Sequence, residues 1–184
     1  MKRQIFKSDF SITSWELLSP YFEELNQREI NSQNQLEKWL LDYNELGAVV
    51  SENMAWRYIN MTCDTTNTEL RDRFNDFVQN IEPNISPIAN DLNKKIINSP
   101  FINQLTKTGY SIYLRGIKNS IDLFREENIP LNTKLQELEQ QFGEINGAQS
   151  IEYKGEKMTL QKAGVFLKDL NRNVREEVYH LVQN

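Results

Sequence analysis

The sequence predicts a mainly α-helical domain: an antiparallel helical bundle with long kinked helices and one small β-hairpin near residues 150–159. Three observations support this class. Apolar residues recur at helical spacing through most of the chain, proline and cap-forming residues divide that pattern, and only one short stretch resembles paired strands. With 184 residues, 39% of them apolar, the chain can form one core, so residues 1–184 are expected to be a single domain.

The clearest helical pattern lies between residues 110 and 145 and is expected to organise the bundle. The two runs of apolar residues are Tyr110, Leu114, Ile117, Ile121 and Phe124, then Leu131, Leu135, Leu138, Phe142 and Ile145. Spacings of four and three residues place each run on one face of a helix. Pro130 suits a first helical turn. The two helices are therefore expected to pack as an antiparallel hairpin, with Ile121 and Leu138 buried in facing seams.

Two helices with start signals are expected before this hairpin. Thr13 and Ser32 each open a capping-box pattern, in which side chains bond to the free N–H groups of the first turn. The helix after Ser32 is expected to continue to about Cys63. Its predicted apolar face consists of Leu36, Leu40, Tyr43, Gly47, Val50, Met54 and Met61. Gly47 is expected to let a second helix approach closely.

A further helical segment follows a turn rich in Asp, Thr and Asn at residues 64–68. These residue types favour turns and N-caps over helix interiors. Apolar spacing then continues from Leu70 to Ile96, across Pro83 and Pro87. Because proline removes a helical hydrogen bond, the pattern predicts one kinked helix or two helices placed end to end.

The last part of the chain mixes strand and helix signals. Residues 151–158 predict a β-hairpin that turns at Lys154-Gly155 and places Ile151 opposite Met158. A short helix is expected over residues 160–167, and Asn171 is expected to cap a final helix. The apolar stripe of that final helix consists of Val174, Val178 and Leu181.

The charge balance argues against two classes of partner. The chain has 21 basic and 26 acidic residues, a net charge of −5, and its basic residues are scattered. Nucleic-acid binding needs a basic surface, so no nucleic-acid partner is expected. No apolar run approaches the roughly 20 residues of a membrane span, so no membrane partner is expected. Without a secretion signal and with one cysteine, Cys63, the protein is expected to be cytoplasmic.

Few residues could support chemistry. The single histidine, His180, lies one helical turn after Glu177, as in di-iron bundles, but such sites need a second pair of this kind. A zinc peptidase helix needs an H-E-x-x-H motif, which one histidine cannot supply. Cys63 is expected to be a small buried apolar side chain rather than a nucleophile. No catalytic, metal-binding or substrate-binding residue is therefore assigned, and no cofactor is expected in this chain.

The run Trp56-Arg57-Tyr58 leaves two interpretations open. It could be a stacking or binding patch. The favoured interpretation is a helix–helix contact in which Arg57 extends its charged end to solvent.

A set of short runs, taken in order, carries a resemblance to a known family. The runs are Trp56 to Ile59, Met61 to Thr65, Phe124 to Leu131, Gly147-Ala148, the hairpin around Gly155, Thr159 to Ala163 and Arg175 to Tyr179. Together they resemble the N-terminal region of bacterial oligoendopeptidase F-type enzymes, which belong with the thimet-oligopeptidase-like zinc metallopeptidases. The resemblance extends from about Phe22 to the end of the chain.

The resemblance implies the N-terminal helical lobe of a two-lobed enzyme, whose deep channel admits peptides but not folded proteins. It also implies zinc-dependent hydrolysis of oligopeptides by the full-length parent. The zinc ligands are expected beyond Asn184, in a C-terminal catalytic domain of the same polypeptide, so residues 1–184 are interpreted as an inactive fragment. The alternative is a free-standing helical scaffold or protein-interaction domain without enzymatic activity. An uncovered stripe on the last helix is expected to give a weak homodimer.

Overall fold

The computed structural model describes residues 3–184, which form helices and one two-stranded antiparallel sheet. The elements in chain order are α1 (Trp15–Gln27), α2 (Gln33–Cys63), α3 (Thr68–Asp76), the π-helical turn η1 (Phe77–Ile81), α4 (Glu82–Ile97), the 3-10 turn η2 (Ile102–Gln104), α5 (Tyr110–Leu123), α6 (Asn128–Ala148), β1 (Ser150–Tyr153), β2 (Glu156–Thr159), α7 (Leu160–Ala163), the 3-10 turn η3 (Phe166–Lys168) and α8 (Arg172–Gln183). The predicted class, mainly α with one small hairpin, is confirmed. Within the described range, no helix is long and apolar enough to cross a membrane.

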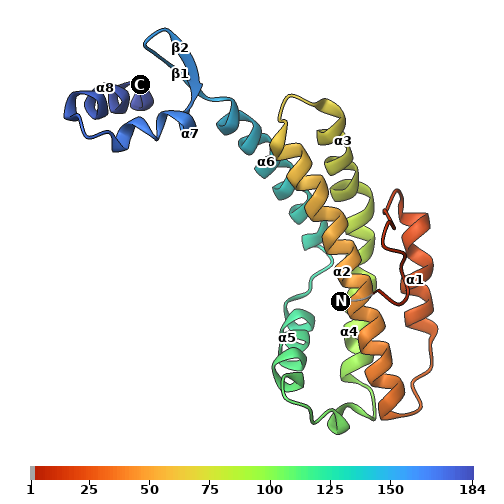
Figure 1. Ribbon diagram of the computed structural model, residues 1–184. Coiled ribbons are helices and arrows are strands. Elements are labelled where there is room, and N and C mark those ends of the chain that lie inside the picture. The colour runs from red at the N-terminus through yellow and green to blue at the C-terminus, as the bar shows by residue number, and fades with distance from the viewer. Residues whose placement is uncertain (1–2) are drawn as a thin grey trace.

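The molecule is elongated (Figure 1). A larger lobe contains α1 to α5, and α6 leads from it to a small unit made of the hairpin, α7 and α8. The C-terminus lies in the small unit.

The core of the larger lobe forms where α1 packs against α2 and α4. Trp39 is fully buried there, and its indole N–H donates to the carbonyl of Leu25 at 2.8 Å. The predicted face of α2 is buried at Leu40, but Val49, outside that face, is buried as well. The reason is that neighbouring elements cover α2 on more than one side. Gly47 is exposed with no atom near its Cβ position, so the predicted close helix contact there is wrong.

The two predicted capping boxes have different outcomes. Ser32 is the N-cap of α2, and its hydroxyl accepts the N–H of Gln35 at 3.2 Å, as predicted. Thr13 is not a cap, because α1 begins one residue later than predicted, with Ser14 at the N-cap. Ser14 has extended backbone geometry and makes no side-chain capping bond to the helix.

The segment across the two prolines is continuous but irregular. α3, η1 and α4 follow one another without a break, which confirms the predicted kinked or end-to-end helices. Pro83 is the second residue of α4 and directly follows the π-helical turn, a common site of helix irregularity, and Pro87 lies inside the helix. Phe77 and Ile81, in the π-helical turn, are both buried in the large core.

The predicted hairpin of α5 and α6 is wrong. The first apolar run does line a buried face, because α5 packs on α4 with Ile117 buried. The second run faces outward, since α6 packs on η1 and α4 through its polar side. Its five seam residues have exposed fractions of 65% at Leu131, 54% at Leu135, 49% at Leu138, 69% at Phe142 and 66% at Ile145. Leu138 is therefore not buried opposite Ile121.

The small unit has a core of its own. Its hairpin has the predicted register, with Ile151 opposite Met158. Lys154 and Gly155 occupy the turn with φ of 53° and 79°, the left-handed geometry of a type I′ turn. Val178 of α8 is fully buried against this hairpin. Of the stripe predicted for the final helix, Val178 is covered within the chain by the hairpin, α7 and η3, Val174 is partly buried, and Leu181 is 37% exposed.

Candidate functional site

A cavity of about 860 Å³ lies in the larger lobe between α2, α4 and α6. Residues of α3 and η1, together with Ser120 and Phe124 at the end of α5, complete its lining. Its volume is in the range of small-molecule and peptide pockets, about 300–1,000 Å³. Such pockets combine apolar walls with a few converging polar groups, and this cavity has both.

The wall from α2 is apolar with small side chains between larger ones. Met54 and Tyr58 lie along it, one helical turn apart, and Ala55 leaves space beside them. Phe74 and Phe77, from α3 and η1, close the same side with aromatic rings. This wall is a part of the lobe's apolar core that remains open to solvent.

The wall from α4 is polar. Glu82, Ser86, Asn90 and Asn93 recur at spacings of four, four and three residues, which places them on one face of the helix. Asn93 accepts a hydrogen bond from the hydroxyl of Tyr43 at 3.3 Å. Burial, together with the neighbouring Tyr113, raises the pKa of Tyr43 to about 12, so this phenol stays a donor at neutral pH.

Two oxygens on this wall lack partners. Asn90 is 6% exposed, and its side-chain carbonyl oxygen has no hydrogen-bond partner. One carboxylate oxygen of Glu82 is also buried and unpaired. Buried acceptors are almost always paired, so these two are unusual among the described residues.

The wall from α6 is polar because this helix presents its polar side to the lobe. Gln136, Gln140 and Glu144 lie along it at helical spacing. A carboxylate oxygen of Glu144 lies 3.7 Å from the guanidinium of Arg71 on α3. Glu137, also on α6, accepts a hydrogen bond from the side-chain amide of Gln79 on η1 at 2.8 Å. These contacts fix which face of α6 meets the cavity.

The run Trp56-Arg57-Tyr58 takes part in a helix–helix contact, because the ring centres of Tyr58 on α2 and Phe74 on α3 lie 6.1 Å apart. Trp56 and Tyr58 are 57% and 55% exposed, and Tyr58 lines the cavity. Arg57 points inward rather than to solvent: it donates to the carbonyls of Ile12 and Asn53, and its guanidinium lies 4.9 Å from the ring centre of Phe77. Arg57 therefore anchors the N-terminal segment. The favoured interpretation is correct about a contact with neighbouring helical elements and wrong about Arg57 extending to solvent.

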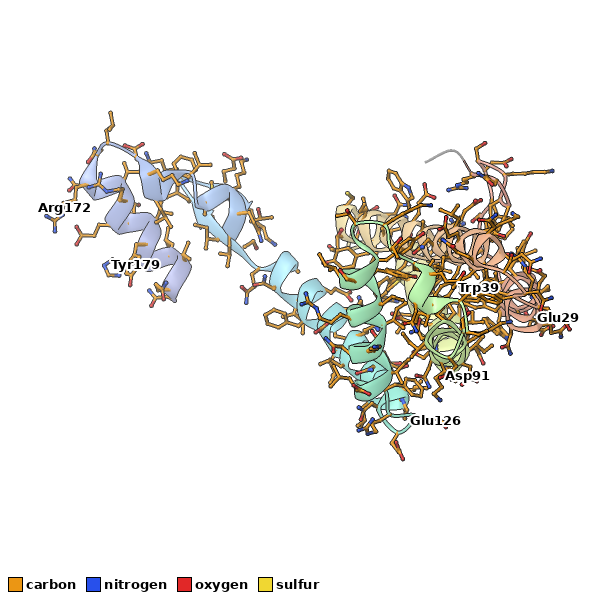
Figure 2. All side chains as sticks on the ribbon, turned by 90° about the horizontal axis from the view of Figure 1, so that it is seen from below. Glu29, Trp39, Asp91, Glu126, Arg172 and Tyr179 are labelled. Atoms are coloured by element: carbon orange, nitrogen blue, oxygen red, sulfur yellow. The ribbon has the colours of Figure 1, made fainter. Side chains whose placement is uncertain are left out.

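The other residues weighed for chemistry lie apart. Cys63 is exposed rather than buried, because it is the last residue of α2 and the chain turns away after it. His180 is exposed on α8, in the small unit, where its neighbour Tyr179 is labelled in Figure 2. Figure 2 also shows this unit well separated from the lobe that contains Trp39. Among residues 3–184, no group of three or more His, Cys, Asp or Glu side chains is placed to hold a metal.

Comparison with known families identifies the part of the chain that surrounds most of the cavity. The family model described as the Peptidase M3 N-terminal domain matches residues 7–124, which include α1 to α5 and most walls of the cavity. The chain belongs to this family. A comparison with curated proteins gives no match.

Two solved structures share the fold of this M3 N-terminal domain. One, assigned as oligoendopeptidase F, has a TM-score of 0.84 and 18% sequence identity, with 95% of this chain and 31% of that chain covered. The other, PZ peptidase A with an inhibitor, has a TM-score of 0.79 and 20% identity, with 95% and 32% covered. The chain thus spans about a third of the length of the solved proteins that it matches.

Proposed function

We propose that residues 1–184 are the N-terminal helical lobe of a zinc-dependent oligoendopeptidase, and that the cavity between α2, α4 and α6 is part of the wall of its peptide channel. The observation that carries this proposal is the match of the family model over residues 7–124. The superposition of 95% of the chain on about a third of two oligopeptidase chains supports it further.

The exposed apolar stripe of α6 supports a partner that covers it. Monomeric proteins rarely expose a long contiguous apolar face. The outer face of α6 exposes five large apolar side chains, spaced three or four residues apart. The proposed partner is the C-terminal catalytic domain of the same polypeptide, which in the matching structures would correspond to the other two-thirds of the chain. Covering the stripe would place that domain against the outer face of α6, the helix whose polar face lines the cavity.

The residues of this chain do not fit the family's zinc. Its single histidine and its single cysteine lie exposed on different parts of the molecule. The unpaired oxygens of Glu82 and Asn90 are eight residues apart on one helix, about 12 Å, which is too far for one ion. In the proposal, the zinc and its ligands therefore belong to polypeptide outside residues 1–184.

The gene beyond codon 184 tests this proposal directly. We expect the reading frame to continue into an H-E-x-x-H segment. The full-length product should hydrolyse a quenched-fluorescent oligopeptide, and a chelator should abolish the activity, whereas residues 1–184 alone should not cleave the peptide. A stop codon directly after codon 184 would contradict the proposal.

A specific observation favours the second candidate, a free-standing scaffold or interaction domain. Val178 is fully buried by other residues of the chain, so the hairpin, α7 and α8 form a unit with an apolar core of its own. In this case the stripe of α6 would bind a separate protein. Size-exclusion chromatography of the natural gene product distinguishes the two, since a scaffold elutes near 21.7 kDa and a peptidase at about three times that mass.

A further inference from the structure

The unpaired buried groups on the polar wall of the cavity are hydrogen-bond acceptors. These two acceptors are the side-chain carbonyl of Asn90 and one carboxylate oxygen of Glu82. Asn90 is 94% buried, and both residues line the cavity. A ligand that supplies N–H donors at both places would satisfy groups that the described residues leave unpaired.

The spacing of these acceptors suits an extended chain. Glu82 and Asn90 are eight residues apart on α4, about 12 Å at the helical rise of about 1.5 Å per residue. An extended peptide covers this distance in three to four residues, at about 3.3 Å each. Across the cavity, the amides of Gln136 and Gln140 on α6 can donate to and accept from a peptide backbone.

The charge of the lining favours a cation. Its charged residues are three carboxylates, Glu82, Glu139 and Glu144, and one guanidinium, Arg71. Arg71 already lies 3.7 Å from Glu144, so the other two carboxylates have no cation among the lining residues. One helical turn after Glu82, the partly buried apolar side chain of Ile85 suits the alkyl stem of a long basic side chain.

We propose that the cavity is a binding site for an oligopeptide with a basic side chain, whose cationic group contacts Glu82 and whose backbone N–H donates to Asn90. The choice of a peptide as the ligand rests on the proposed function. The preference for a positive charge rests on the lining itself.

The test measures peptide binding to the purified chain by isothermal titration calorimetry. The probes are three blocked tripeptides, acetyl-Leu-Arg-Leu-amide and its counterparts with Gln or Glu in the central position. We expect the Arg peptide to bind at least about tenfold more tightly than the Glu peptide, as one charge-assisted hydrogen bond allows. Equal affinity for the three peptides, or no binding by the folded chain, would overturn the inference.

Two variants and a control assign the contacts. Glu82→Gln should reduce affinity for the Arg peptide to that for the Gln peptide, while Asn90→Leu should weaken binding of all three. Glu127→Gln, the same charge change at an exposed position outside the cavity, should change nothing. Because Glu82 is only partly buried, its variant decides the question even if Asn90→Leu does not fold. Unchanged binding by Glu82→Gln would contradict the assigned contact.

The peptide-binding test and the test of the proposed function can fail independently. A folded chain that binds no basic peptide refutes this inference, whereas the lobe proposal depends on the reading frame and the activity of the full-length product. A stop codon after codon 184 would refute the lobe proposal and leave a measured peptide affinity intact.

Discussion

At the residue scale, a few buried polar side chains hold distant segments together. The carboxylate of Glu45 on α2 accepts the backbone N–H groups of Gln4, Ile5 and Phe6 at 2.8 to 3.0 Å. Burial raises the pKa of Glu45, but the bonds from Phe6, Gln4 and Ile5, together with the charge of Arg3, outweigh it, so the pKa lies below its ordinary value. This residue ties the N-terminal segment to the lobe.

The Glu45→Gln variant should weaken these hydrogen bonds to the N-terminal segment. We expect the free energy of unfolding at pH 7 to fall by about 1–3 kcal/mol, the range for hydrogen bonds to a charged group. Because the folded-state pKa is depressed, the stabilisation is complete above about pH 4.3 and is lost as the pH falls through the folded pKa. Urea unfolding of wild type and variant from pH 7 to pH 3 should therefore show the two converging. Glu23→Gln, at an exposed site, is the control, and an equal loss there would contradict the assignment.

A lysine of α4 caps the end of α1. The ammonium of Lys95 donates to the carbonyls of Leu25, Asn26 and Arg28 at 3.0, 2.7 and 2.7 Å, and these belong to the last turn, where helical partners are missing. Lys95→Met should lower the free energy of unfolding by about 1–3 kcal/mol. Its neighbour Lys94 is exposed, so Lys94→Met should cost under about 0.5 kcal/mol in the same urea titration. Similar costs for both variants would contradict the capping role.

At the element scale, α6 shows what sequence spacing can and cannot predict. The spacing of its apolar residues predicts the helix and its apolar face, and both are correct. Spacing does not say which face the rest of the chain covers. In α6 the polar face is covered, held by Gln79 and Arg71, and the apolar face is left outside. The polar wall of α4 was unpredictable for the same reason, because Glu82, Ser86 and Asn90 look like a solvated face until α6 is placed over them.

Substitution in the apolar stripe of α6 should leave stability almost unchanged. Leu138 is 49% exposed, so Leu138→Glu should change the free energy of unfolding by less than about 0.5 kcal/mol. Leu92 is fully buried in the lobe, and Leu92→Ala should cost about 2–5 kcal/mol. Thermal and urea unfolding would show this contrast. A large loss in Leu138→Glu would mean that α6 covers its apolar face.

The same variant tests self-association. With the stripe of α6 uncovered, we expect residues 1–184 to associate weakly at high concentration through α6 rather than through α8. Sedimentation velocity should detect dimers of the wild type and only monomers of Leu138→Glu. The comparison is Val182→Glu, at a partly buried position of α8. If Val182→Glu abolished the dimers and Leu138→Glu did not, the contact would be assigned to α8.

At the scale of the whole molecule, the residues that the structure describes form three apolar clusters. A large one and a minor one, made of Met61, Phe74 and Val78, lie in the larger lobe, and a small one lies in the C-terminal unit. The large one lies within residues 6–121, and the small one within residues 151–182. The helices of both units and the hairpin of the small unit are predictable from local sequence. Their separation is not, because it depends on α6 carrying the chain away from the lobe (Figure 1).

Separate cores should unfold separately. Val178→Ala, in the small core, should lower hydrogen-exchange protection across residues 150–183 and leave α2 and α4 unchanged. Hydrogen exchange followed by mass spectrometry would resolve the two regions. An equal loss of protection in α2 would mean that the molecule unfolds as one cooperative unit.

The position of α6 also has a mechanical consequence. A helix of 21 residues is about 31 Å long, so a tilt of about 10° at its base would move its far end by about 5 Å. The helix would pivot at its contact with η1 and α4, and the small C-terminal unit would move with its far end. Anything that wedges open the cavity beneath α6 would swing that unit through a displacement larger than the one that started it.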